Sequence, residues 1–169
     1  DSEGVVMLDE AYADFCGSDM LSDVMNAPHA VDVRTFSKAY GLAGLRIGYA
    51  ISRKEVIDEL RSFRTPFGLN SFAEAVAVRA MDTSDWVHEV VSKTKAEMAY
   101  LRPKLESLGF KVYPSDCNFL LCRSPVPSPG LVSALRADGV AIRDCNAYPL
   151  LGDHVRITIA PRPMLDILL

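Results

Sequence analysis

Two ionisable side chains stand where apolar runs of the sequence end. Asp9 follows the run "VVML" (residues 5–8), and Lys38 comes shortly after "AVDVRTF" (residues 30–36). Both runs are typical of strands in a parallel sheet, and we expect the first of them to be buried. Because ligands of open α/β sheets bind beyond the carboxyl ends of the strands, Asp9 and Lys38 could face one crevice.

The chemistry of these two groups, together with Arg46 eight residues after Lys38, favours one kind of ligand. A lysine made less basic by burial or by neighbouring cations is a nucleophilic amine that forms an imine with an aldehyde. A buried carboxylate needs a cationic partner or several hydrogen-bond donors, and the fork of an arginine suits a phosphate. Pyridoxal phosphate requires an amine at its aldehyde, an anion at its pyridinium nitrogen and donors at its phosphate.

The segments around these residues resemble a known family. "LDEAYADF" followed by "RTFSKAYGLAGLRIGY" is similar to the fold-type I pyridoxal-phosphate enzymes, most closely to the histidinol-phosphate aminotransferase branch of the class I/II aminotransferases. The resemblance continues through "YPSDCNFLL", "GVAIRD" and "VRITIAPR". It implies an α/β fold: part of a large domain, with a mostly parallel sheet and helices, followed by a smaller α+β C-terminal domain. The chain would be the C-terminal portion of such an enzyme.

The resemblance also implies roles for the residues that match the family's motifs. Lys38 would form the imine with pyridoxal 5'-phosphate and would then act as the general base that moves the proton between the substrate Cα and the cofactor C4′. Asp9 would keep the pyridine nitrogen protonated, so that the ring can withdraw electrons. Tyr12 would donate a hydrogen bond to the phenolate oxygen of the ring.

Further polar residues match the phosphate and substrate positions of the family. Ser37 and Arg46 would bind the cofactor phosphate, with Thr35 as a weaker candidate. Arg156, in "VRITIA", matches the arginine that grips the substrate carboxylate, where a bidentate fork gives orientation. Arg162 lies where that branch often has a second arginine. The resemblance implies no metal site.

Each role has a structural alternative. Glu10 could be the functional acid in place of Asp9, although the order "DEAY" favours Asp9. Tyr12 could be a half-buried packing residue, and Ser37 could cap a helix. Arg46 could pair with a surface acid, but its glycine- and leucine-flanked position in a presumed strand favours a specific buried anion.

The remaining elements follow from periodicity and from breaker residues. We expect helices over 19–25, 53–63, 71–81, 83–109 and 130–139, with Pro103 kinking or splitting the longest. Ser71 is the expected N-cap of the third, and Pro66 and Gly68 mark a loop. Further strands are expected over 46–51, 111–115, 118–123, 140–144 and 155–160. The pattern predicts a partial cofactor-binding large domain over 1–90 and a small α+β domain over 91–169, truncated at its end.

The composition of the chain argues against several classes of protein. The 169 residues carry 18 basic and 22 acidic side chains, a net charge of −4, and the basic residues form no run. Nucleic-acid and anionic-membrane binding are therefore unsupported. The four cysteines form no C-x-x-C pair, which argues against zinc and against a disulfide framework. No signal peptide or membrane-spanning run is recognised, so we expect a cytoplasmic protein.

The resemblance favours an aminotransferase acting on small molecules, with L-histidinol phosphate or glutamate as amino donor and 2-oxoglutarate as the 2-oxo acid acceptor. The alternatives are an aromatic-amino-acid aminotransferase, a threonine-phosphate decarboxylase of the same fold, and an inactive fragment that only folds or dimerises. The full-length protein is expected to be a homodimer. Family residues that precede Asp9 are missing here: a phosphate loop, a ring-stacking aromatic and an asparagine. We therefore expect this piece alone to be inactive.

Overall fold

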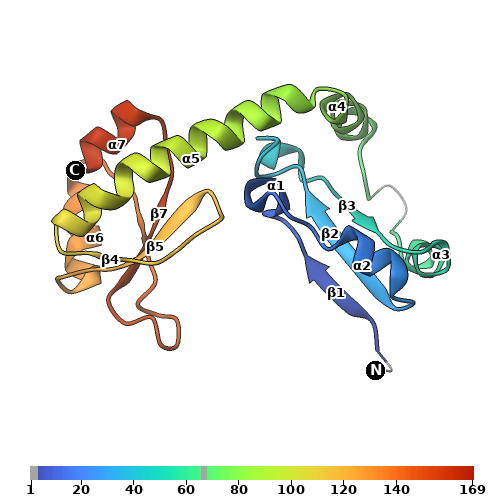
Figure 1. Ribbon diagram of the computed structural model, residues 1–169, viewed down its shortest axis with the longest axis horizontal. Coiled ribbons are helices and arrows are strands. Elements are labelled where there is room, and N and C mark those ends of the chain that lie inside the picture. Colours follow the sequence, from blue (N-terminus) through green and yellow to red (C-terminus); the bar gives the residue numbers. More distant parts are fainter. Residues whose placement is uncertain (1–3, 66–67) are drawn as a thin grey trace. The chain divides into compact units, whose positions relative to one another are not determined.

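The computed structural model describes residues 4–65 and 68–169, and these divide into two compact units. Unit 1 comprises Asp1–Val90 and unit 2 comprises Val91–Leu169. Figure 1 shows a small sheet with helices in each unit. None of the helices in the described ranges is long and apolar enough to cross a membrane. The expected Pro66 breaker lies outside the described residues.

A three-stranded sheet forms the centre of unit 1. Its strands β1 (Val6–Asp9), β2 (Ala30–Thr35) and β3 (Gly48–Ile51) lie in that order, with β1 parallel and β3 antiparallel to β2. The central strand pairs Val33 with Asp9 on one side and Thr35 with Gly48 on the other. The carboxyl ends of the parallel strands β1 and β2 therefore lie at the same edge of the sheet.

The expectation that β1 is buried was wrong. Val6 is 45% exposed and Met7 is 69% exposed. The physical reason is that β1 is the edge strand of this sheet and, within the described residues, pairs only with β2. An apolar run predicts a strand, but burial of that strand depends on neighbours that the run itself does not contain.

The α-helices of the described residues that lie wholly within unit 1 are α1 (Ala13–Cys16), α2 (Leu21–Asn26), α3 (Lys54–Ser62) and α4 (Ser71–Met81). The expected N-cap of α4 was misplaced by one residue. Asn70 is the N-cap, and its side-chain oxygen accepts a hydrogen bond of 2.7 Å from the backbone N–H of Ala73. Asn and Ser are both good N-caps, so the sequence does not separate two adjacent candidates.

The longest helix, α5 (Ser84–Ser107), is not split by Pro103. Proline removes one intrahelical hydrogen bond, but Pro103 stands near the end of the helix, where few bonds remain to be disturbed. The chain then leaves the helix through Gly109, whose φ of +86° is the left-handed conformation that suits glycine. The predicted helix is therefore confirmed, and the expected split was wrong.

Unit 2 contains a four-stranded antiparallel sheet in the order β4-β5-β7-β6. Helices α5, α6 and α7 contribute to one core with β5 and β7. The expected strands over 111–115 and 140–144 are confined to two residues each. The bounds are β4 Lys111–Val112, β5 Phe119–Arg123, α6 Ser128–Ala137, β6 Arg143–Asp144, β7 His154–Thr158 and α7 Arg162–Leu168.

The two faces of this sheet differ in kind. Leu120 of β5 is paired with Ile157 of β7, and both side chains belong to the buried core with Leu101 of α5. Alternation along a strand places Leu121 and its partner Arg156 on the opposite face. The helices thus pack on one face, and Arg156 belongs to the other.

We expect Leu120→Ala to lower the free energy of unfolding of unit 2 by about 2–5 kcal/mol, because it leaves a cavity in a fully buried position. Urea denaturation followed by circular dichroism measures the loss. The matched control is Leu150→Ala, which removes the same atoms from a side chain that is 99% exposed. Equal effects of the two substitutions would contradict the assignment of this core.

Candidate active site

The register of β1 and β2 brings Asp9 to the edge of the sheet from which the Lys38 segment departs. Asp9 is the last residue of β1 and pairs with Val33, and the backbone N–H of Glu10 continues the ladder to the Val33 carbonyl at 3.0 Å. The exposed Asp9 carboxylate accepts a hydrogen bond of 3.1 Å from the Ala11 N–H. This leaves lone pairs of the carboxylate available to a ligand.

The Lys38 backbone is held by buried neighbours on both sides. Phe36 donates its N–H to the Ile47 carbonyl at 3.2 Å, and the N–H of Gly41 reaches the Lys38 carbonyl at 2.9 Å. Phe36 and Ala39 are buried. A flexible lysine side chain therefore extends from a fixed turn, which is the arrangement that a covalent cofactor needs.

The amine of Lys38 lies over the ring of Tyr12, with 5.3 Å between Nζ and the ring centroid. Among the residues that the structure describes, no carboxylate lies within ion-pairing distance of this amine. The structure thus brings together two of the residues that the sequence singled out, which are 26 positions apart.

Thr35 has a structural role in the turn that leads from β2 to Lys38. The Thr35 Oγ1 accepts a hydrogen bond of 3.0 Å from the backbone N–H of Ser37. Such a bond stabilises the turn without any ligand. No helix of the described chain begins at Ser37, so the capping alternative for that residue was wrong.

Arg46 does not lie in a strand, contrary to expectation. It follows a 3-10 helix, η1 (Ala43–Leu45), and adopts a left-handed conformation with φ of +52°. Its side chain is exposed, and Nη1 donates to the Ala43 carbonyl at 3.1 Å. Strand β3 begins only at Gly48. Arg46 therefore lies in the turn that precedes the strand, where its side chain is not buried.

The side chain of Arg156, in unit 2, has one buried nitrogen whose hydrogen-bonding capacity is not met by the described residues. Its Nε is buried and, within the described chain, has no hydrogen-bond partner. The guanidinium carbon lies 5.0 Å from the centroid of the Phe119 ring, and Arg143 is its partner across the strands β6 and β7. Because an unpaired buried donor is costly, an anionic ligand at Arg156 would satisfy it.

The family model for aminotransferase class I and II matches residues 1–169. The chain belongs to the class I and II aminotransferase family. It is 39% identical over 163 residues to a histidinol-phosphate aminotransferase from Methanocella arvoryzae, covering 95% of this chain and 44% of that protein. It is also 39% identical to histidinol-phosphate aminotransferase 1 from Archaeoglobus fulgidus, covering 94% of this chain and 48% of that protein.

Solved structures show the same likeness. The histidinol-phosphate aminotransferase from Sinorhizobium meliloti, in complex with pyridoxal-5'-phosphate, matches with a TM-score of 0.86 and 29% identity over 97% of this chain and 46% of that chain. The L-threonine-O-3-phosphate decarboxylase from Porphyromonas gingivalis matches with a TM-score of 0.79 and 26% identity over 95% of this chain and 51% of that chain. The predicted fold-type I α/β class is confirmed, and the chain spans about half the length of these aminotransferase relatives.

The residues present fit the family's cofactor, pyridoxal phosphate. Lys38 offers an amine without an ion pair in the described residues, and Asp9 offers a carboxylate at the adjacent strand end. An amine for the aldehyde and an anion for the ring nitrogen are what this cofactor requires of a protein.

Arg162 is engaged within unit 2. Its Nε and Nη2 donate to the two carboxylate oxygens of Glu97 at 2.6 and 3.2 Å, and its guanidinium lies 3.4 Å from the centroid of the Tyr100 ring. The bidentate bond to Glu97 raises the pKa of Arg162. These contacts give Arg162 a structural role. Its role in binding substrate stays a prediction.

A charge cluster that sequence reasoning missed lies at the end of β2. Arg34 donates from Nε to Oδ2 of Asp32 at 2.7 Å and from Nη2 to Oε2 of Glu10 at 2.8 Å. Asp19 approaches the same guanidinium at 3.4 Å. We call Glu10, Asp19, Asp32 and Arg34 the Arg34 cluster. Since Glu10 is committed to it, the alternative that Glu10 replaces Asp9 as the functional acid loses support.

Burial and pairing act in opposite directions on the central cation of the Arg34 cluster. Burial lowers the pKa of Arg34, but the hydrogen bond to Asp32 and the charges of Asp32 and Glu10 raise it, and the raising effects win. Arg34 is therefore held as a cation. The only signal in the sequence was a pair of opposite charges, Asp32 and Arg34, inside an otherwise apolar strand.

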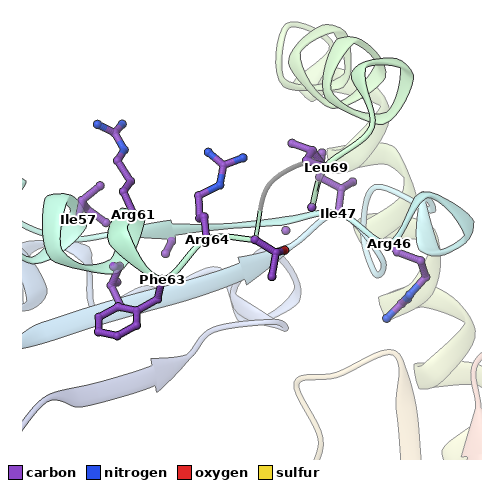
Figure 2. A pocket seen from close by; sticks show the side chains of 12 residues that line it. Arg46, Ile47, Ile57, Arg61, Phe63, Arg64 and Leu69 are labelled. Carbon is purple, nitrogen blue, oxygen red and sulfur yellow. The ribbon is translucent and has the colours of Figure 1, made fainter.

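A cavity of about 700 Å³ in unit 1 lies away from these residues. It is lined in part by Arg46, Arg61 and Arg64. Figure 2 shows the side chains of Arg61 and Arg64 directed to one side and that of Arg46 directed away from them. These three cations do not converge, and neither Asp9 nor Lys38 lines the cavity. We assign no site to it.

Proposed function

We propose that the protein to which this chain belongs is a pyridoxal-phosphate-dependent aminotransferase that uses L-histidinol phosphate as amino donor and 2-oxoglutarate as acceptor, with glutamate as the product and as the donor of the reverse reaction. The observation that carries the proposal is the placement of Asp9 and Lys38 at one edge of the sheet, with the Lys38 amine beside Tyr12. Family membership supports this reading. A homodimer and a cytoplasmic location are parts of the same proposal.

In the proposed mechanism, bound pyridoxal phosphate supplies an aldehyde and an electron-withdrawing ring. The Lys38 amine would hold the cofactor and, once displaced by the substrate amine, would be the general base that carries the proton from the substrate Cα to the cofactor C4′. The negative charge of Asp9 would hold a proton on the ring nitrogen. Its position at the end of a paired strand fixes where that charge lies.

Three more residues of unit 1 orient the cofactor in this proposal. Tyr12 donates its hydroxyl to the phenolate oxygen of the ring, and its place beside Lys38 supports that role. Ser37 and Arg46 would hold the phosphate. Within the described residues, the exposed guanidinium of Arg46 makes one hydrogen bond, to the Ala43 carbonyl, and its other N–H groups are available to a bound anion. Thr35 supports the turn that carries Ser37.

Arg156 is the proposed anchor for the substrate anion. Histidinol phosphate has no carboxylate, so the same arginine would hold the substrate phosphate in one half-reaction and the 2-oxoglutarate carboxylate in the other. Both anions accept two hydrogen bonds from a guanidinium fork. The buried Nε without a partner in the described residues supports this assignment.

We expect Arg156→Lys in the full-length protein to raise KM for 2-oxoglutarate on the order of tenfold or more, since a lysine cannot provide the bidentate contact. Steady-state kinetics at saturating amino donor measures the change. Arg123→Lys is the control, because Arg123 is an exposed arginine of the neighbouring strand β5. An unchanged KM in Arg156→Lys would exclude Arg156 from the substrate site.

One experiment separates the proposed aminotransferase from its alternatives. Full-length protein is mixed with pyridoxal phosphate, and its visible absorbance is recorded before and after addition of glutamate or histidinol phosphate. A band that shifts with an amino donor supports the aminotransferase. The threonine-phosphate decarboxylase, favoured only by the structural likeness to that enzyme, would release carbon dioxide from threonine phosphate. A protein that forms no band is the inactive alternative.

A panel of amino donors then identifies the substrate. Histidinol phosphate is tested first, followed by aromatic amino acids, with 2-oxoglutarate as the common acceptor. We expect the highest kcat/KM with histidinol phosphate. A preference for phenylalanine or tyrosine would instead identify an aromatic-amino-acid aminotransferase.

A further inference from the structure

The Arg34 cluster stands directly behind the two residues on which the proposed chemistry depends. Glu10 follows Asp9 in the chain, and Arg34 precedes Lys38 by four residues. Because Asp9 is paired with Val33, alternation puts Glu10 and Arg34 on the face of the sheet opposite to Asp9. The cluster therefore reaches the ends of both strands without occupying the face that carries Asp9.

The ion pair between Glu10 and Arg34 is well shielded from water. The exposed fraction of the side chain is 12% for Glu10 and 16% for Arg34. Charged hydrogen bonds in such surroundings are stronger than those on an open surface. The ion pair thus joins the end of β1 to the end of β2, next to Asp9 and Val33, the last pair of residues in the β1–β2 ladder.

The other contacts of these two residues extend the same connection. The second carboxylate oxygen of Glu10 accepts a hydrogen bond of 2.8 Å from the backbone N–H of Met20, the residue before α2. Arg34 is anchored in turn by the fully buried Asp32 at 2.7 Å. Glu10 and Arg34 therefore join the end of β1, the end of β2 and the start of α2.

The backbone of Arg34 is confined from the other side as well. A Cβ at Gly48 of β3 would lie 2.6 Å from the Arg34 carbonyl oxygen, closer than real contacts allow. Glycine at this position lets β3 approach the strand that leads to Lys38. Arg34 is thus fixed by its side chain toward β1 and by close backbone packing toward β3.

We propose that Glu10 and Arg34 are positioning residues that set the separation of the Asp9 carboxylate and the Lys38 amine by locking the two strand ends from the far face of the sheet. This inference rests on the proposed function, because the separation matters only if one cofactor bridges both groups. Neither residue touches the reacting atoms. They act through the backbone of β1 and β2.

The test uses Glu10→Gln in the full-length protein. Glutamine keeps the shape and can still accept the Met20 N–H, but it removes the negative charge that faces Arg34. The expected result is a Kd for pyridoxal phosphate that rises on the order of tenfold, because one shielded charged hydrogen bond is lost. The pH midpoint of the visible absorbance band should shift at the same time.

A second readout does not need the cofactor. Hydrogen exchange of the backbone amides over residues 9–12 and 36–41 is expected to be faster in Glu10→Gln than in the parent protein. Asp19→Asn is the matched control, because it removes another carboxylate beside Arg34 from a position that is 45% exposed and not at a strand end. We expect its Kd and exchange rates to stay within about twofold of the parent values.

The outcomes separate this inference from the proposed function. If the parent protein binds no pyridoxal phosphate, both fail. If the parent binds it while Glu10→Gln lowers only Tm and leaves the Kd and the absorbance midpoint unchanged, the pair is merely structural and this inference alone is overturned. Should Glu10→Gln not fold, Arg34→Lys gives the same test, since lysine keeps the charge but cannot bridge Asp32 and Glu10.

Discussion

Replacing Lys38 by alanine in the full-length protein is expected to lower transamination at least about 1,000-fold, because one residue supplies both the covalent attachment and the general base. The turn around Lys38 is fixed by buried Phe36 and Ala39, so the backbone should survive the change. Initial rates with histidinol phosphate and 2-oxoglutarate measure the effect. Borohydride treatment should attach the cofactor to the parent protein and not to Lys38→Ala.

Lys54→Ala is the control for this substitution. Lys54 is an exposed lysine of the same unit, and it forms an ion pair with Asp58 one turn along α3. Such surface pairs contribute little to stability, so activity and borohydride labelling should match those of the parent protein. Residual transamination in Lys38→Ala above one hundredth of the parent rate would contradict the assignment of Lys38.

Asp9→Ala is expected to give the second-largest effect, a fall in kcat of about 100- to 1,000-fold, because the electrostatic support of the ring nitrogen is lost. The affinity for pyridoxal phosphate should fall far less, since the covalent link to Lys38 and the phosphate contacts remain. Parallel measurement of kcat and of the Kd for the cofactor separates the two quantities.

The control is Asp82→Ala, which removes an exposed carboxylate of the same unit at the C-cap of α4. It should leave both kcat and the Kd for the cofactor unchanged. If Asp9→Ala instead lowered kcat and cofactor affinity by equal factors, Asp9 would be a structural residue at a strand end. Glu10 would not then replace it, because its carboxylate is bound to Arg34.

The parts of the fold that sequence predicts here are those with local causes. The runs before Asp9 and before Lys38 are apolar and β-branched, and the structure has parallel strands at both places. The long helix is also local in origin, since its periodicity outweighs a single Pro103 near its end. The roles of Asp9 and Lys38 rest on the family motif and stay predictions until the substitutions are made.

The features that sequence did not predict depend on contacts between distant segments. Arg46 looks like a strand residue among glycines and leucines, but packing of Phe36 against Ile47 sets the turn that gives Arg46 its positive φ. The Arg34 cluster needs the register of β1 against β2, which places Glu10 beside Arg34. Neither arrangement is visible in the periodicity of one segment.

The exposed edge of β1 has a practical consequence for work with this chain. Val6 and Met7 present apolar side chains beside backbone groups that no strand of the described residues pairs. An uncovered flat edge of this kind is a template for intermolecular sheet growth. Purified alone at high concentration, the chain is prone to precipitate through that edge, so biophysical measurements on it call for dilute samples or a lysine introduced at position 7.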